Sequence, residues 1–218
     1  MIAERLGVII VAWLVGGIPF GFLIAKSRGL DIREHGSGNI GATNVTRVLG
    51  KKLGILCFIC DAGKGFVPVF LATRLVAEDP TRWPAWLAAT AVFATVAGHV
   101  WTPYLGFKGG KGIATSAGAL IGIAPVPLLM ALGLWMVVFF ASRYVSLASI
   151  LAAASLPLTG LALRQFASPP WNNLAPSTLV LLAVVGLLAI VRHSSNIRRL
   201  LDGTENRFER KPKESAET

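Results

Sequence analysis

Cysteine and acidic residues are scarce in this sequence. Its 218 residues include two cysteines, Cys57 and Cys60, with no second cysteine pair and no nearby histidine to complete a tetrahedral zinc site. We therefore expect no metal site, and we interpret both cysteines as small apolar residues on one helix face. Asp and Glu together number 11 against 21 Lys and Arg residues, which gives a formal net charge of +10.

Several common catalytic motifs are also missing. Five residues after the three histidines stand Ile40, Tyr104 and Arg198, so the sequence lacks the H-x-x-x-x-D motif in which histidine acts as a general base. It also lacks the G-x-S-x-G elbow that is typical of serine hydrolases. These absences argue against an acyltransferase that uses the His–Asp motif and against a serine hydrolase.

Hydrophobic residues, in contrast, make up 54% of the chain against 15% charged residues, and the mean hydropathy is +0.63. They occur in runs of the length needed to cross a hydrocarbon core of about 30 Å. The runs lie near residues 6–25, 53–76, 84–105, 113–124, 126–141, 147–165 and 175–191. They predict an all-α integral membrane protein, a bundle of seven transmembrane helices. Pro125 and Pro127 mark either a tight turn between two helices or a kink in one.

The distribution of basic residues predicts the topology. The basic segments 26–52, 106–111, 142–143 and 192–213 share one side of the membrane only if the fourth and fifth runs cross separately. That arrangement places 17 of the 21 basic residues on the cytoplasmic side, counting Lys64, with the N-terminus outside and the C-terminus cytoplasmic. The positive-inside rule then accounts for the net charge, and we expect no nucleic acid partner. We expect residues 1–207 to form a single transmembrane domain and residues 208–218 to be a disordered cytoplasmic tail.

The first cytoplasmic loop, residues 35–47, is rich in glycine, serine, asparagine and threonine and ends in Arg47. Gly36, Gly38 and Gly41 match G-x-G-x-x-G, but a membrane span rather than a β-strand precedes them, which excludes a dinucleotide site. The loop offers many hydrogen-bond donors and one cation. A flexible solvated connector is the alternative interpretation.

The segment 106–115 has two lysines and four glycines between apolar runs. Glycine permits positive φ angles that can point successive N–H groups at an anion, and lysine adds charge that can reach a phosphate. Lys111 is followed by Gly112, so the segment is not a Walker A loop. It predicts an anion-binding loop at the membrane surface.

Asp61 and Lys64 place opposite charges three residues apart within the second run. An unpaired charge near the bilayer centre costs at least about 3 kcal/mol, so these side chains must pair or face a watery cavity. Two interpretations remain open for Lys64, a structural ion pair and a role in binding substrate.

The last two cytoplasmic segments carry further polar groups. Ser146 follows a basic turn between the fifth and sixth runs. If the segment from residue 192 is helical, His193 shares a face with Asn196, and Asn196 shares a face with Arg199. Glu205 lies past Gly203, a natural helix stop, and is free to fold back onto a cation.

Together these segments resemble the three motifs of the bacterial acyl-phosphate:glycerol-3-phosphate acyltransferase family (PlsY), in the same order and over essentially the full chain. Ile40, where many members carry proline, and Ser194 are departures at variable positions. The matches are Gly36–Asn39 and Gly41–Asn44 through Arg47, then Gly98–His99 and Phe107–Gly112 through Thr115, and finally His193, Asn196–Ile197, Arg199–Leu200, Gly203 and Glu205.

The resemblance implies an enzyme of the bacterial inner membrane, with its active site on the cytoplasmic face. Such an enzyme transfers an acyl chain from a long-chain acyl phosphate to the 1-hydroxyl of glycerol 3-phosphate. Lysophosphatidic acid and inorganic phosphate are the products, in the first step of phospholipid synthesis. No metal or soluble cofactor is expected. The acyl tail is expected to lie in membrane lipid between spans, and docking of the peripheral enzyme that makes acyl phosphate stays open.

The resemblance also assigns residues. It gives catalysis to Ser37 and Arg47, with support from His193 and Asn196, and it gives glycerol phosphate binding to the loop Lys108–Gly112. We expect the substrates to contact Lys108, Gly109, Gly110, Lys111, Gly112, Asn39, Thr43, Asn44, Lys64 and Ser146, with structural support from Glu205, Arg199 and Asp61.

The alternative function is transport of phosphate esters or other organic anions. Transporters place ion sites near the bilayer midplane on broken helices and often contain inverted repeats. Asp61 and Lys64 are the features that favour it, whereas the polar motifs lie in loops on one face and no repeat is evident.

Overall fold

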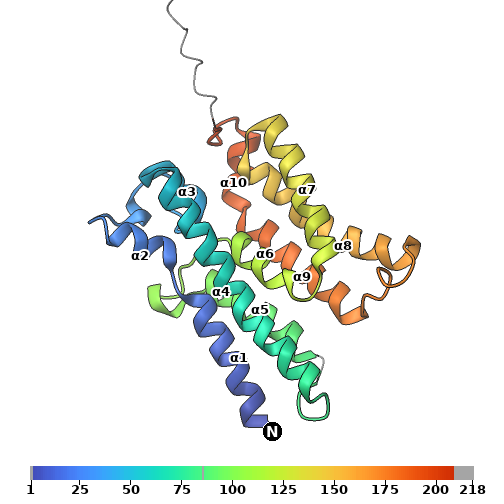
Figure 1. The fold of residues 1–218 in the computed structure, drawn as a ribbon. Coiled ribbons are helices and arrows are strands. Elements are labelled where there is room, and N and C mark those ends of the chain that lie inside the picture. The colour runs from blue at the N-terminus through green and yellow to red at the C-terminus, as the bar shows by residue number, and fades with distance from the viewer. Residues whose placement is uncertain (1, 85, 209–218) are drawn as a thin grey trace, which may run out of the picture.

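A computed structural model describes residues 2–84 and 86–208 of the chain, and every regular element in this part is a helix (Figure 1). In chain order these are α1 (Ile2–Gly17), α2 (Phe20–Lys26), η1 (Ile32–Glu34), α3 (Ala42–Leu49), α4 (Lys51–Glu78), α5 (Trp86–Val100), η2 (Pro103–Leu105), α6 (Ile113–Ile121), α7 (Pro125–Ser142), α8 (Val145–Phe166), α9 (Pro176–Arg192) and α10 (Ser194–Leu201). Of the expected C-terminal tail, only Phe208 lies within the described residues.

Each of the seven predicted apolar runs is helical, which confirms the all-α prediction for the described residues. Within the described residues, four segments are long and apolar enough to cross a membrane: Ile2–Lys26, α4, α7 and α8. The pair α9 and α10, bent by 56°, counts as a fifth only if the bent pair forms one span. Helix α6 has only nine residues, or about 14 Å, less than half of a hydrocarbon core. The crossing of all seven runs stays a prediction.

The helical structure is interrupted between α6 and α7, where the sequence allowed either a tight turn or a kink in one helix. Helix α6 ends at Ile121, and α7 begins at Pro125, the first residue of the helix. Proline suits this position because its missing N–H would have no intrahelical partner there. The tight turn is therefore correct, and the single kinked helix is wrong.

A second break, at Ile18 and Pro19, separates α1 from α2 and frees backbone carbonyls inside a candidate span. Thr102 Oγ1 donates to the Gly17 carbonyl at 2.6 Å, and Lys64 Nζ donates to the Ile18 carbonyl at 2.6 Å. Lys64 Nζ also lies 2.8 Å from Asp61 Oδ1, so the predicted pairing forms. In hydrocarbon, freed backbone groups must be satisfied by other parts of the protein, and these side chains do so.

Helices α4 and α6 cross at glycines. A Cβ atom at Gly65 would overlap the Thr115 carbonyl, and one at Gly118 would overlap the Ala62 carbonyl. Helices α1 and α5 meet in the same way at Gly16. Small residues let helix backbones approach closely, which is how helices associate where lipid removes the hydrophobic driving force. This packing fixes α6, and therefore the loop before it, against α4.

Two hydrophobic clusters hold the bundle. The larger one joins α1 and α4–α9. The smaller one lies beneath the loop between α2 and α3, and its buried residues are Ala25, Ile32, Ile40, Val45 and Cys57. In Figure 1 the elements α2, α3 and α10 lie toward one end of the molecule, and the N-terminus lies toward the other. The smaller cluster therefore anchors a polar loop at the end where the other polar segments gather.

Gly65→Ala and Gly63→Ala, two residues apart on α4, test the glycine crossing. The added methyl at Gly65 overlaps the Thr115 carbonyl, and overpacking of this kind costs about 1–3 kcal/mol. At Gly63 nothing lies within 4 Å, and alanine is favoured over glycine in a helix by about 0.4–1 kcal/mol. Thermal unfolding in detergent micelles should show a lower midpoint for Gly65→Ala and an equal or higher one for Gly63→Ala. Equal midpoints for both variants would contradict the crossing.

Candidate active site

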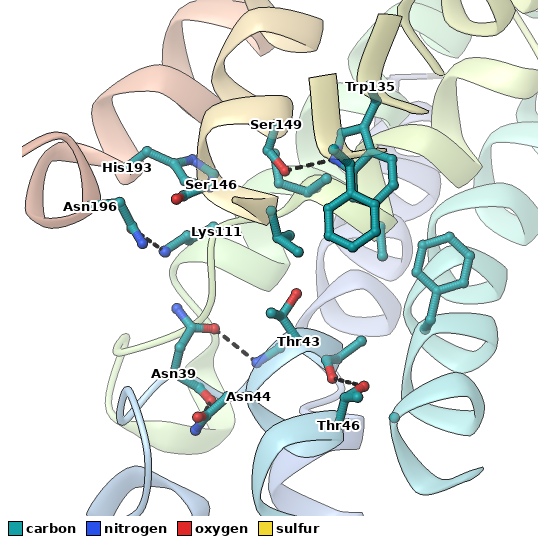
Figure 2. Close-up of a pocket in the computed structure, with 18 of the residues that line it drawn as sticks. Asn39, Thr43, Asn44, Thr46, Lys111, Trp135, Ser146, Ser149, His193 and Asn196 are labelled. Atoms are coloured by element: carbon teal, nitrogen blue, oxygen red, sulfur yellow. Dashed lines mark hydrogen bonds between the residues drawn. The ribbon is translucent and has the colours of Figure 1, made fainter. Parts of the chain in front are cut away.

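A cavity of about 710 Å³ lies between the loop preceding α3, helices α3, α4 and α6, and the group formed by α7, α8 and α10. Figure 2 shows Asn39, Thr43 and Asn44 on one side of it, with Lys111, Asn196, Ser146 and His193 on the other. Its remaining wall is largely apolar and includes Ile55, Phe58, Ala117, Leu129, Leu132, Trp135, Met136 and Phe139. One cavity thus combines a polar end with an apolar groove.

The side chain of Asn44 organises the polar loop before α3. Its Nδ2 donates to the carbonyls of Ile32 at 3.3 Å, His35 at 3.0 Å and Asn39 at 2.9 Å. Its Oδ1 accepts from the Ser37 backbone N–H at 2.9 Å. Asn44 is 2% exposed, so its amide replaces the solvent that these backbone groups would otherwise bind. The loop is therefore a fixed structure rather than a flexible connector.

Ser37 of this loop and Arg47 of the following helix α3 both line the cavity. The Ser37 side chain is exposed, and its hydroxyl makes no hydrogen bond within the described residues. Arg47 Nη1 is 3.5 Å from Asn44 Oδ1, and its guanidinium faces the ring of Phe208. No carboxylate in the described part of the chain forms an ion pair with Arg47. Its charge is available to an anion.

The glycine loop before α6 is built differently from the expectation. The Gly109 N–H donates to the Val100 carbonyl at 3.1 Å, and the Gly110 N–H donates to the His99 carbonyl at 3.2 Å. These two N–H groups are used within the protein, so the expected anion-binding concavity is not formed by them. Arg192 donates to the loop's other face, with Nη2 at 3.2 Å from the Gly110 carbonyl. The loop is thus held from both sides.

Lys111 is the lysine of this loop that lines the cavity. Its Nζ makes a short hydrogen bond to Asn196 Oδ1, which Figure 2 shows. Burial is the main cause that lowers the pKa of Lys111 to about 8; the nearby arginines add to the lowering, and Glu205 opposes it. A bound phosphate would add a negative charge that offsets the repulsion from these arginines.

Glu205 ties α8 and α10 together beside Lys111. Its carboxylate accepts from Ser146 Oγ at 2.9 Å, Asn196 Nδ2 at 2.7 Å and Arg199 Nε at 2.7 Å. Its side chain is only 6% exposed, and this desolvation alone would raise its pKa. The three hydrogen bonds outweigh it and lower the pKa of Glu205, which keeps the carboxylate charged. The ion pair with Arg199 fixes the position of Asn196.

His193 stands at the bend between α9 and α10. Its Nδ1 is 2.7 Å from the Ala189 carbonyl, which can only accept, so Nδ1 carries the proton. The Nε2 atom makes no hydrogen bond within the described residues, although the residue lines the cavity. His193 therefore offers the cavity a hydrogen-bond acceptor.

The apolar groove runs between α4 and α7, with α6 as its floor. Ile55 and Phe58 come from α4, Leu129 and Met136 come from α7, and Ala117 comes from α6. The four larger side chains are also exposed on the outside of the protein, which in a membrane faces lipid. The groove therefore has the composition and position to receive an acyl chain from the bilayer.

Most predicted site residues come together, and some do not. Those that line the cavity are Ser37, Asn39, Thr43, Asn44, Arg47, Asp61, Lys111, Gly112, Ser146, His193, Asn196, Arg199 and Glu205. Lys64, Lys108, Gly109 and Gly110 do not line it. Lys108 is exposed elsewhere, and a Cβ atom at Gly110 would meet the His99 ring, so the His99 side chain explains that glycine. Among residues 2–84 and 86–208, no cluster of His, Cys, Asp or Glu is suited to hold a metal ion.

Three contributing residues were not predicted: Arg192, Trp135 and Phe208. Arg192 directly precedes the predicted site residue His193, and this position was the sequence signal that could have identified it. Trp135 lies in the middle of an apolar run, and its indole N–H donates to Ser149 Oγ at 3.1 Å (Figure 2). An indole N–H inside the membrane needs a partner within the protein, so the position of Trp135 away from the membrane interface indicated a polar contact. Phe208 had no sequence signal.

Comparison with known proteins agrees with this site. The profile of the family described as glycerol-3-phosphate acyltransferase matches residues 6–203. A glycerol-3-phosphate acyltransferase of Geobacter sulfurreducens is 46% identical over 198 residues, which cover 91% of this chain and 94% of its own. Two crystal structures of PlsY (YgiH), an integral membrane glycerol 3-phosphate acyltransferase, are 41% identical and cover 94% of this chain and 96% of that one. The TM-score is 0.84 for the glycerol 3-phosphate form and 0.82 for the lysophosphatidic acid form.

Asn44→Ala should loosen the loop that carries Ser37. The change removes the acceptor of the Ser37 N–H and the donor to the Asn39 carbonyl, whereas the Ile32 and His35 carbonyls keep a backbone donor. A buried polar group left unsatisfied costs about 1–3 kcal/mol. Hydrogen exchange followed by mass spectrometry in detergent should become faster over residues 36–41 and stay unchanged in α8. Asn39→Ala is the control, because Asn39 Oδ1 accepts only from the Gly41 N–H. If Asn44→Ala exchanges like the wild type, Asn44 does not organise the loop.

Proposed function

The chain belongs to the glycerol-3-phosphate acyltransferase family, and from this membership we propose that it transfers an acyl chain from an acyl phosphate to the 1-hydroxyl of glycerol 3-phosphate. The products are lysophosphatidic acid and inorganic phosphate. The observation that carries the proposal is the single cavity that joins unpaired cations to an apolar groove. A phosphate and an acyl chain fit its two parts.

The polar end suits two phosphate groups. Arg47 and Lys111 line it without a carboxylate partner among the described residues, so both can bind phosphate oxygens. The Ser37 hydroxyl adds a hydrogen-bond donor on the Arg47 side. We place the phosphate of the acyl donor with Ser37 and Arg47, and the phosphate of glycerol 3-phosphate with Lys111.

The chemistry follows from the donor. Acyl phosphate is an activated mixed anhydride, so the enzyme needs mainly to position the reactants and to stabilise the developing charge. The glycerol 1-hydroxyl attacks the acyl carbon, a new ester C–O bond forms, and the bond from the acyl carbon to the phosphate oxygen breaks. The hydroxyl proton passes to an oxygen of the donor phosphate, which leaves as inorganic phosphate. A trapped acyl-enzyme on Ser37 would overturn this direct attack.

His193 and Asn196 complete the acceptor side. The free Nε2 of His193 can accept a hydrogen bond from a substrate hydroxyl, which would orient it toward the acyl carbon. Asn196 Oδ1 accepts a hydrogen bond from Lys111 Nζ, and Asn196 Nδ2 donates one to the Glu205 carboxylate. Asn196 thus holds the lysine that we assign to the acceptor phosphate.

The transport alternative loses its support. Asp61 and Lys64 favoured it as isolated charges inside a span, but Lys64 bonds to Asp61 and to the Ile18 carbonyl. These contacts use the lysine to close a helix break. The polar groups that remain free in the cavity are those of the three motifs.

The chain is an integral membrane protein with several membrane-spanning helices. We propose further that all seven runs cross the membrane, with the N-terminus outside and the active site on the cytoplasmic face of the bacterial inner membrane. The gathering of α2, α3 and α10 at one end supports this topology (Figure 1). Residues 1–207 would then form one catalytic domain, and the enzyme that makes acyl phosphate would approach from the cytoplasm.

One assay tests the function. Purified protein is given glycerol 3-phosphate with either palmitoyl phosphate or palmitoyl-CoA, and lysophosphatidic acid is measured. We expect product from palmitoyl phosphate alone. The proposal fails if product forms from palmitoyl-CoA alone or from neither donor.

The pKa of Lys111 makes a second prediction. Because burial lowers this pKa to about 8, the charged form that binds phosphate is lost as the pH rises above about 8. The KM for glycerol 3-phosphate should therefore rise between about pH 8 and 9.5, where its phosphate, with a second pKa near 6, is already a dianion. In Lys111→Arg the rise should disappear, because guanidinium keeps its charge.

Lys108→Arg is the matched control for this pH profile. Lys108 belongs to the same loop but does not line the cavity, so its replacement should leave the rise in KM unchanged. A rise in KM that persists in Lys111→Arg would show that another group titrates. Donor stability is measured at each pH without enzyme.

A further inference from the structure

The chain after α10 doubles back along the wall of the cavity. Gly203 has a left-handed φ of 70°, and the N–H groups of Thr204 and Glu205 donate to the Arg199 carbonyl at 2.8 and 3.1 Å. We call residues Thr204–Phe208 the C-terminal strap. The family profile matches only to residue 203, so the strap lies beyond the matched part of the chain. Two of its residues besides Glu205 line the cavity, Asn206 and Phe208.

The strap is fixed at both ends. Glu205 holds its beginning through the three hydrogen bonds to Ser146, Asn196 and Arg199. At its other end the Phe208 N–H donates to the Arg143 carbonyl at 3.1 Å, and Arg207 Nε donates to the Ser142 carbonyl at 3.1 Å. These carbonyls lie at the end of α7, where no intrahelical donor is available.

The ring of Phe208 bridges the two sides of the cavity. The Arg47 guanidinium carbon lies 5.9 Å from its centroid, and the Phe139 ring lies 6.0 Å away with its plane at 75°. Arg47 belongs to α3 and Phe139 belongs to α7, and both residues line the cavity. Among the described residues, the guanidinium makes one hydrogen bond, to Asn44 Oδ1 at 3.5 Å.

Arginine has many rotamers, and a loosely held guanidinium loses much entropy when it binds a phosphate. A ring that holds the guanidinium before substrate arrives reduces that loss and keeps the charge aimed at the reacting phosphate. The Phe208 ring is suited to this task because its own backbone is anchored to α7. Its edge meets Phe139, an apolar wall residue.

We propose that Phe208 is a positioning residue: its ring holds the Arg47 guanidinium at the phosphate end of the cavity and closes the seam between α3 and α7. This inference rests on the proposed function, in which Arg47 binds the phosphate of the acyl donor. It extends the site from Glu205, the last residue of the third motif, to Phe208.

Three replacements of Phe208 distinguish the effect of its aromatic face on Arg47 from the effect of its apolar packing. Phe208→Leu keeps an apolar side chain and removes the aromatic face, Phe208→Ala removes both, and Phe208→Tyr keeps the face. We expect Phe208→Leu and Phe208→Ala to lower kcat/KM for palmitoyl phosphate by about 3- to 30-fold, the range of a cation–π contact, while the KM for glycerol 3-phosphate stays unchanged. Phe208→Tyr should retain wild-type kinetics.

Phe140→Leu is the matched control. The Phe140 ring also faces a guanidinium, that of Arg143 at 5.8 Å, and lies near the same end of α7, but it is 63% exposed and does not line the cavity. It should leave the kinetics unchanged. In an Arg47→Gln background, Phe208→Leu should cause no further loss, because the contact that it removes is already absent.

Binding of a non-hydrolysable acyl phosphonate gives a readout that is independent of turnover. If the wild type is active and Phe208→Leu changes neither binding nor turnover, the positioning role is wrong. Equal losses in Phe208→Leu and Phe208→Tyr would also overturn it. If the wild type makes no lysophosphatidic acid but Phe208→Leu still weakens phosphonate binding, the proposed function fails and the positioning role stands.

Discussion

Hydrocarbon offers no hydrogen-bond partners, so every irregular stretch of backbone inside the membrane must be satisfied by the protein itself. The break between α1 and α2 shows how this constraint organises the molecule. Thr102, which follows α5, and Lys64, from α4, take the two freed carbonyls, and Asp61 balances the lysine charge. These bonds tie α1, α4 and the segment after α5 to one another. The glycine crossing of α4 with α6 then sets where the loop before α6 can lie, and thus where Lys111 enters the cavity.

The balance of charge in the site is the second determinant of function. Glu205 is almost fully buried and satisfied by three donors, so it organises Asn196 and Arg199 without neutralising the other cations. Arg47 and Lys111 have no carboxylate partner in the described part of the chain. A substrate phosphate can therefore supply the charge that these side chains lack. An acyl phosphate is activated already, and a site that positions it and stabilises charge does not need the His–Asp pair that the sequence lacks.

Sequence reasoning was strongest where the physical cause is local. Apolar runs indicated helices, and prolines indicated an interruption near Pro125, although turn and kink both stayed open. A spacing of three residues on a helix allowed Asp61 and Lys64 to pair, and they do. It was weakest where the partner is distant along the chain. The Ile18 carbonyl lies 46 residues before Lys64, so the structural task of this lysine could not be seen beforehand. For the same reason the loop glycines suggested an anion-binding backbone, although the Gly110 N–H bonds to α5.

The sequence by itself determined that this protein resides in a membrane, that it is helical, and that it carries three polar motifs of one acyltransferase family. Composition, helical periodicity and short motifs act within a few residues, and they are legible without a fold. Only the tertiary structure decided that Lys111 lines the cavity while Lys108 does not, that a groove opens between α4 and α7, and that Phe208 reaches Arg47. These features depend on side chains from separate helices meeting at distances of a few ångströms. Helix packing sets such distances, and no short stretch of sequence encodes them.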